Sequence, residues 1–72
     1  MHIGQEIKNK IREKNISIVS FAHQLSYTRA NIYKILDKKS IDTDLLIRIS
    51  AILQYDFFKH FSQELDDRFK QS

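Results

Sequence analysis

Residues 14–36 carry basic and amide side chains but no aspartate or glutamate, although the chain has nine acidic residues. Arg29, Asn31, Tyr33 and Lys34 lie within this segment. Arginine and lysine can donate hydrogen bonds to the O6 and N7 atoms of guanine, and asparagine can bond adenine. A carboxylate in the same segment would face phosphates or these acceptor atoms and be repelled. The residue types therefore predict a surface that meets an anion.

The distribution of charge favours the same interpretation. Residues 8–39 contain eight basic residues and two acids, a local balance of +6, whereas residues 40–72 contain four basic residues and six acids, a balance of −2. One part of the chain is thus suited to a polyanion, although lysines are also common as solvated surface residues. A further basic set occurs at a spacing of two, which spreads its members around a helix, so we expect most of them to be solvated. These residues are Lys8, Lys10, Arg12 and Lys14.

Length and composition limit the other possibilities. Seventy-two residues allow one domain, and the absence of cysteine excludes a disulfide framework and a thiolate metal site. The apolar runs are far shorter than the ~20 residues that span a bilayer, and the N-terminal segment lacks the apolar core of a signal peptide. We therefore expect a soluble, intracellular protein that makes no membrane contact.

Apolar residues recur at helical spacing, and no proline interrupts them. We expect five short helices, which together make a small all-α domain. The expected N-cap residues of the second to fifth helices are Ser17, Thr28, Asp42 and Asp56. The expected inward-facing residues are Ile3, Ile7 and Ile11 in the first helix, Ile18, Phe21, Ala22 and Leu25 in the second, Ile32, Ile35 and Leu36 in the third, Leu45, Leu46, Ile49, Ile52 and Leu53 in the fourth, and Phe57, Phe58 and Phe61 in the fifth.

About three residues separate the second and third helices, too few for a parallel pair and suited to a sharp crossing. This is the spacing of a helix-turn-helix, in which the later helix enters the major groove of DNA. Ala22 lies where the two helices approach most closely, and Tyr27 can fill the turn against the core. Ser26 lies where the turn favours glycine because the backbone there is left-handed, a departure expected to cost about 1 kcal/mol.

One ordered set of residues is distributed over residues 3–61. Its members are Ile3-Gly4, Ile7, Asn15-Ile16-Ser17, Phe21-Ala22, Leu25, Thr28-Arg29, Ile32, Ile35, Leu46, Ile49, Leu53 and Asp56. This set resembles the lambda-repressor-like, or XRE, helix-turn-helix family. The resemblance implies a compact five-helix DNA-binding domain over residues 1–65, with a tail or helix extension over residues 66–72. Ile18, Lys38 and Ile41 depart from the family pattern, which often has glutamine at the first position and glycine and proline in the later loop.

The resemblance also implies roles for individual residues of the third helix, expected over residues 28–37, and of its flanks. The implied base-reading residues are Thr28, Arg29, Ala30, Tyr33 and Lys34. The implied phosphate-binding residues are Ser17, Asn31, Lys38, Lys39 and Ser40. Arg29 is our first choice for base recognition, and simple coverage of the helix surface is an alternative role for Tyr33.

By this resemblance we expect a transcriptional regulator, in particular a repressor, that binds double-stranded DNA as a homodimer. The family also implies a cytoplasmic protein of prokaryotic or phage origin. The expected dimer surface consists of Phe57, Phe58, Phe61, Leu65 and Phe69.

Two rival functions come from other classes of protein. The main alternative is an antitoxin-like or other protein-interaction module that uses the same scaffold to bind a protein partner. An enzyme is not expected, because the sequence lacks a glycine-rich phosphate loop, a helical histidine pair and a nucleophile with suitable partners. For the same reasons we expect no metal site and no cofactor.

Overall fold

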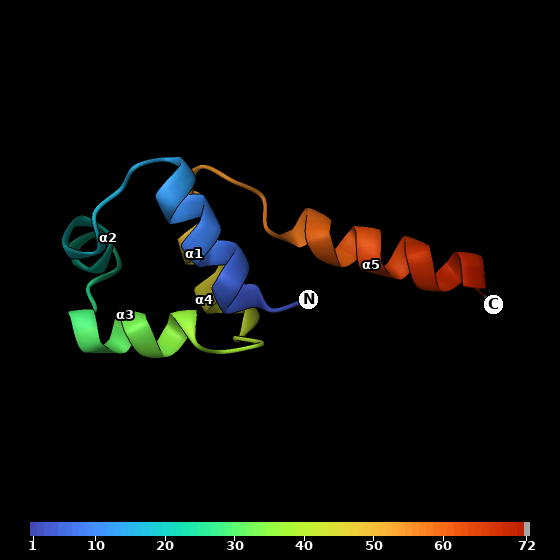
Figure 1. The fold of residues 1–72 in the computed structure, drawn as a ribbon, viewed down its shortest axis with the longest axis horizontal. Helices are drawn as coiled ribbons and strands as arrows, with labels where there is room; N and C mark the ends of the chain where they lie inside the picture. Colours follow the sequence, from blue (N-terminus) through green and yellow to red (C-terminus); the bar gives the residue numbers. More distant parts are fainter. Residues whose placement is uncertain (72) are drawn as a thin grey trace.

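The computed structural model of the chain describes residues 1–71, and every regular element in this range is an α-helix. In chain order these are α1 (Ile3–Glu13), α2 (Ile18–Leu25), α3 (Arg29–Leu36), α4 (Thr43–Leu53) and α5 (Phe58–Gln71) (Figure 1). The expected all-α architecture of five helices is confirmed. Residues 66–71 of the expected tail continue α5, and Ser72 lies outside the described residues. None of the helices in residues 1–71 has the length and hydropathy of a bilayer-spanning segment.

Side chains cap the first turns of α1, α2, α3 and α4. Each accepts a hydrogen bond from a backbone amide that has no partner within its own helix. The predicted caps Ser17, Thr28 and Asp42 are confirmed. At α1 the cap is His2, whose Nδ1 accepts from the amide of Gln5 at 3.0 Å. The three predicted caps accept from the amides of Ser20 (3.0 Å), Asn31 (3.2 Å) and Leu45 (2.8 Å).

The start of α5 differs from the prediction by one residue. Asp56 Oδ1 accepts from the amide of Phe58 at 2.9 Å, and α5 begins at Phe58. Phe57 therefore lies in the turn before the helix, where its side chain is fully buried. The rings of Tyr55 and Phe57 meet edge-on with their centroids 4.8 Å apart, which anchors the turn in the core. Phe57 is thus a core residue and not part of a dimer surface.

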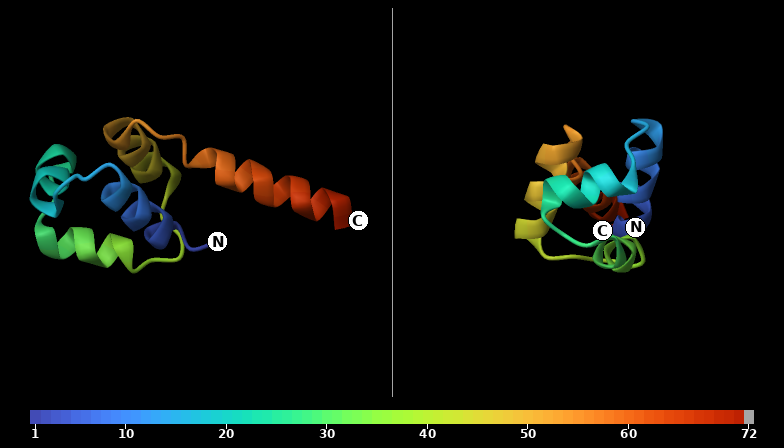
Figure 2. Two further views of the ribbon diagram at one scale, coloured as in Figure 1. Left: turned by 45° about the horizontal axis from the view of Figure 1, so that its top comes forward. Right: turned by 90° about the vertical axis from the view of Figure 1, so that its left-hand side faces the viewer.

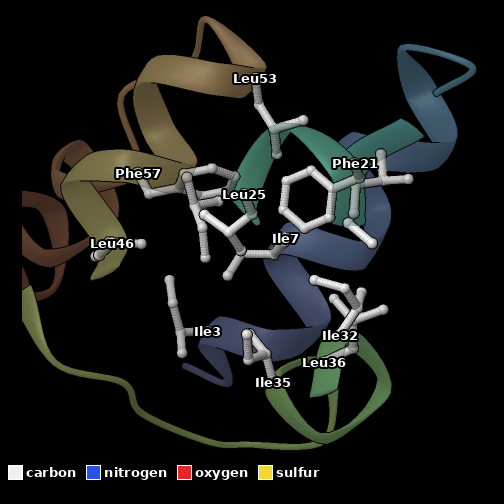
Figure 3. Packing of buried hydrophobic residues seen from close by; sticks show 13 residues of the cluster. Ile3, Ile7, Phe21, Leu25, Ile32, Ile35, Leu36, Leu46, Leu53 and Phe57 are labelled. Atoms are coloured by element: carbon white, nitrogen blue, oxygen red, sulfur yellow. The ribbon is translucent and has the colours of Figure 1, made fainter. Parts of the chain in front are cut away.

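The hydrophobic core lies among α1, α2, α3 and α4 (Figure 3). Burying each large apolar side chain stabilises the fold by about 1.5–3 kcal/mol relative to exposure. No residue of α5 is buried to the same extent. The buried apolar residues are Ile3, Ile7, Ile11, Phe21, Ala22, Leu25, Ile32, Ile35, Leu36, Leu46, Ile49, Leu53 and Phe57.

Helix α5 extends away from the other four helices (Figures 1 and 2). The molecule measures 43 × 20 × 19 Å along its principal axes, and the long axis follows α5. Phe58 and Phe61 pack against the edge of the core, whereas Leu65 and Phe69 are 52% and 66% exposed. The outer half of α5 therefore presents apolar side chains to solvent.

The connection between α2 and α3 contains a left-handed residue at Ser26, with φ 61° and ψ 40°. The amides of Ser26 and Tyr27 donate to the carbonyls of His23 (3.1 Å) and Ala22 (2.9 Å), which closes the end of α2. A residue with a Cβ is sterically disfavoured in this backbone region. The left-handed position expected from the sequence is therefore present, and it is filled by serine.

Replacing Ser26 by glycine should raise the free energy of unfolding by about 1 kcal/mol, because glycine adopts the left-handed region without the steric cost of a Cβ. Urea unfolding followed by circular dichroism measures the change. Ser26→Ala is the matched control, since it removes the hydroxyl but keeps the Cβ, and it should give no increase. Equal stabilisation by both substitutions would show that the gain in stability does not come from the left-handed backbone at this position.

Candidate functional site

The outward side of α3 brings the five expected base-reading residues together. The apolar residues of α3 turn into the core, so the polar residues remain on the opposite side. Side chains four positions apart share a helix face, which places Arg29 beside Tyr33 and Ala30 beside Lys34, with Thr28 at the capped end. All five are exposed, and Tyr33 is 53% exposed. Within residues 1–71, neither Arg29 nor Lys34 forms an ion pair, so both cations are available to a ligand.

The expected phosphate-binding residues are also exposed. Ser17 is the N-cap of α2, Asn31 lies in the first turn of α3, and residues 38–40 follow the end of α3. The hydroxyl of Ser17 accepts from the amide of Ser20 and can still donate to an acceptor. These exposed side chains can therefore contact an anion together with the base-reading residues.

The segment that follows α3 is held by the start of α1. The amide of Ile3 donates to the carbonyl of Lys39, and the amide of Gly4 donates to the carbonyl of Lys38, each at 2.9 Å. These two amides open a helix and have no intrahelical acceptor, so the carbonyls of the segment satisfy them. The side chains of Lys38 and Lys39 remain exposed. Their backbone is therefore ordered before any ligand arrives.

Gly4 allows this close approach because it has no side chain. A Cβ at this position would lie 2.3 Å from the carbonyl oxygen of Leu36 and 2.7 Å from that of Lys38. Both neighbours are backbone atoms that cannot rotate away. The sequence contains one signal for this contact, a single glycine inside a helical apolar pattern, but the pattern does not indicate its partner.

Arg48 braces the connection between α2 and α3 from α4. Its Nη2 donates to the carbonyl of Leu25 at 2.7 Å, and its guanidinium lies 5.8 Å from the centre of the Tyr27 ring. The carbonyl belongs to the last turn of α2, where helix carbonyls lack intrahelical donors. Sequence reasoning did not assign Arg48 a role, because its acceptor is a main-chain atom far away in the sequence.

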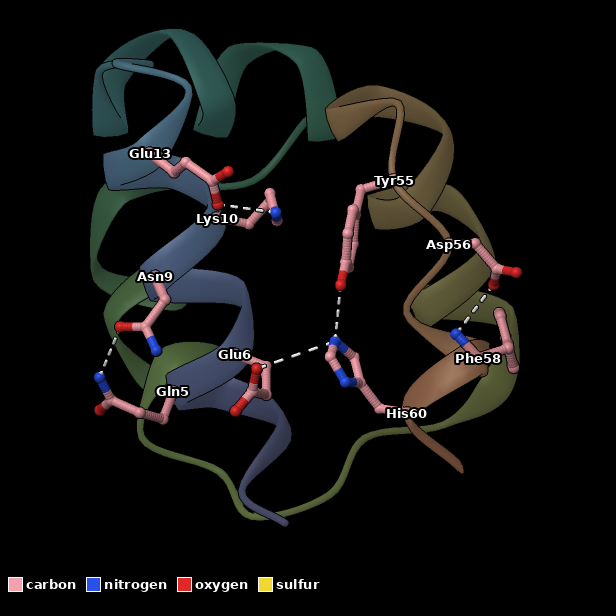
Figure 4. A network of polar contacts seen from close by, with 9 residues as sticks. All are labelled: Gln5, Glu6, Asn9, Lys10, Glu13, Tyr55, Asp56, Phe58 and His60. Carbon is pink, nitrogen blue, oxygen red and sulfur yellow. Dashed lines mark hydrogen bonds and ion pairs between the residues drawn. The ribbon is translucent and has the colours of Figure 1, made fainter. Parts of the chain in front are cut away.

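A polar cluster fixes the base of α5 against α1 (Figure 4). The Tyr55 hydroxyl and His60 Nε2 form a hydrogen bond of 2.8 Å, and Glu6 Oε2 lies 3.8 Å from the same nitrogen. Lys59 Nζ lies 4.3 Å from the centre of the Tyr55 ring. Because these groups come from α1, α5 and the segment between α4 and α5, they set the direction in which α5 leaves the core.

Lys10 belongs to this cluster and not to the surface around α3. Its Nζ lies 2.7 Å from Glu13 Oε2 and 3.9 Å from the centre of the Tyr55 ring. The hydrogen bond from Lys10, together with its charge, holds the pKa of Glu13 below its usual value. One of the four closely spaced basic residues in the range 8–14 is thus already engaged by neighbouring groups.

The histidines make contacts of their own. His2 caps α1, His60 bonds Tyr55, and His23 is exposed on α2. No group of three or more histidine, cysteine, aspartate or glutamate side chains in the described part of the chain is arranged to hold a metal ion.

Comparison with known proteins gives no relative: no family model, no curated protein and no solved structure matches the chain. The functional assignment therefore depends on the sequence pattern and on the surface around α3.

Gly4→Ala should lower the free energy of unfolding by about 2 kcal/mol or more, because the added methyl overlaps two carbonyl groups and overpacking alone costs about 1–3 kcal/mol. Helix propensity alone predicts the opposite sign, a gain of about 1 kcal/mol. Urea unfolding measures the free energy of unfolding and so distinguishes the predicted loss from the predicted gain.

Asn9→Ala, at an exposed position of the same helix, is the control. It removes only the exposed hydrogen bond that Asn9 Oδ1 accepts from Gln5 Nε2, so, apart from the change in helix propensity, the free energy of unfolding should change by less than about 0.5 kcal/mol. A Gly4→Ala variant as stable as the unmodified chain would show that the close contact with α3 is not required.

Proposed function

We propose that the chain is a sequence-specific DNA-binding domain of the helix-turn-helix type that inserts α3 into the major groove and regulates transcription, most simply as a repressor. The observation that carries this proposal is the outward side of α3, where exposed hydrogen-bond donors gather without an acid. Helix α3 contains no aspartate or glutamate, and Arg29 and Lys34 have no ionic partner within residues 1–71. The resemblance to the lambda-repressor-like family supports the same function.

The chemistry of these side chains suits base recognition. Arg29 can bond the O6 and N7 atoms of a guanine in a bidentate manner, and Lys34 can donate to the same acceptors. The methyl group of Ala30 can contact a thymine methyl group. Tyr33 offers a hydroxyl and a large exposed ring beside Arg29. Together these residues can distinguish base pairs, which a purely electrostatic surface cannot do.

The flanking residues suit the phosphate backbone. Lys38, Lys39 and Ser40 belong to a segment in which the carbonyls of Lys38 and Lys39 are already fixed by α1, so little backbone conformational entropy is lost when the segment binds. Ser17 and the first amides of α2 form a second contact region, because helix N-termini attract anions. Such contacts position the domain without reading sequence. If each monomer neutralises four to six phosphates, log affinity should fall against log salt with a slope of about −4 to −5.

A second copy of the chain is the proposed partner on DNA. One α3 offers a small contact area, so useful specificity ordinarily requires two half-sites about one helical turn apart. Phe58, Phe61, Leu65 and Phe69 lie along one side of α5, whose outer half extends beyond the core. The margins of this side carry charges of both signs, so a second identical helix can meet it without net repulsion. These charges are Lys59, Glu64, Asp66 and Arg68.

Selection of bound sequences from random duplex DNA tests the function directly. A single preferred site, arranged as two half-sites about 10 base pairs apart, is the expected result. In binding titrations, Arg29→Ala and Lys34→Ala should each weaken binding to that site by about 1–3 kcal/mol, because a base contact is lost. Gln24→Ala, at an exposed position of α2 outside the expected site, is the control.

Binding with equal affinity to every duplex would exclude a sequence-specific regulator. If the two α3 variants keep the full cellular activity of the chain and the unmodified protein ignores DNA, the interaction module becomes the better explanation.

Leu65→Glu should abolish assembly of two copies on the selected site, because it places a charge in the middle of the apolar side of α5. Analytical ultracentrifugation in the presence of the duplex measures the number of chains bound. Gln63→Glu introduces the same charge at an exposed position on the other side of α5. It removes the exposed hydrogen bond from Gln63 Nε2 to Asp67 Oδ1 but touches no apolar side chain of the proposed interface, so it should leave the assembly intact. This dimer is ruled out if the unmodified protein stays strictly monomeric, both free and on the selected DNA.

A further inference from the structure

Beside α3 lies an open groove with a volume of about 680 Å³, bounded by α1, by the start of α2 and by α3 itself. Lys8 and Arg12 line it from α1, and Ile18 lines it from α2. Tyr33 lines it from α3, and Asp37 lines it just after the end of α3. The groove thus connects two basic side chains of α1 with one of the residues assigned to base recognition. This connection is not evident from the sequence, where α1 and α3 are separate segments.

Lys8 and Arg12 share one face of α1, because they are four residues apart. Lys10 lies on a different face, where it is engaged by Glu13 and Tyr55. By contrast, neither Lys8 nor Arg12 forms an ion pair with any residue in 1–71. The basic residues of α1 are therefore sorted by face, and two of them point toward the groove beside α3 with their charges unneutralised.

We propose that Lys8 and Arg12 form a phosphate-binding site, here termed the α1 site, that contacts the DNA backbone next to the major groove occupied by α3. The inference rests on the proposed function and extends it to two basic residues of α1 for which the sequence alone predicts only solvation. When α3 lies in the major groove of DNA, which is about 12 Å wide, a phosphate backbone runs along each side of the helix. Lys8 and Arg12 border the protein groove that Tyr33 also lines, which puts them beside α3 and toward one of these backbones in the proposed complex. Lysine and arginine both bind phosphate.

The α1 site adds to the phosphate contacts proposed for the residues that follow α3. Arg12 lines the groove together with the residues that lead into α2, where Ser17 is also found, and Leu36 and Asp37 line the same groove at the end of α3. Additional contacts with the DNA backbone help to fix the register of α3 on the bases. Asp37 is the one acid among the residues that line this groove, and its charge opposes an anion there.

Salt-dependent DNA binding by charge-neutralising variants tests the proposal. Lys8→Gln and Arg12→Gln should each reduce the magnitude of the slope of log affinity against log salt by about 0.9, because one fewer phosphate is neutralised. Each should weaken binding about three- to tenfold near physiological salt, by the same factor on the selected duplex and on a scrambled duplex, since phosphate contacts carry no sequence information. Asp37→Asn should instead tighten binding.

Lys10→Gln is the matched control, because it removes the same charge from the same helix on the other face, and its slope should remain that of the unmodified chain. Thermal unfolding of each variant confirms that the fold is retained. Slopes for Lys8→Gln and Arg12→Gln equal to that of Lys10→Gln would overturn the α1 site while leaving the DNA-binding function intact. Failure of the unmodified chain to bind any duplex would overturn both proposals.

Discussion

The contact between the start of α1 and the segment after α3 organises the rest of the structure. Two backbone hydrogen bonds of 2.9 Å join Ile3 to Lys39 and Gly4 to Lys38, and the missing side chain of Gly4 allows the backbones to approach this closely. The contact fixes one end of α3 on α1, while the turn at Ser26 fixes the other end on α2. Because both ends are held, the side of α3 that faces solvent has one defined orientation.

Much of the fold was predictable because its signals are local. Helical spacing of apolar residues identified the five helices, and Ser17, Thr28 and Asp42 marked helix starts since an N-cap acts on an amide only three residues away. The contacts that were missed are long-range or depend on a single turn. Arg48 bonds a carbonyl 23 residues away. Phe57 lies outside α5, because Asp56 accepts a hydrogen bond from the amide of Phe58 and the helix begins at that residue.

The positions of the expected site residues on the fold were predictable in part for the same reason. Spacing along α3 suffices to put the base-reading residues on one exposed face. The spacing of the basic residues along α1 indicates that they lie on different faces of the helix. It does not indicate which of these faces lies beside α3. The packing of α1 on α3 decides that, and it separates Lys8 and Arg12 from Lys10. The proposed DNA surface consequently draws on three helices and one connecting segment, whereas the proposed contact with a second copy of the chain lies on α5.

The most direct measurement of the central claim is a map of backbone amide chemical shifts in the chain titrated with its selected duplex. We expect the changes to gather on the outward side of α3, at the start of α2, in residues 38–40 and along the Lys8–Arg12 face of α1. The chemical shifts of the amides of α4 should change little. Shifts concentrated on α5 and α4 with α3 unaffected, or no shifts at all, would contradict insertion of α3 into DNA.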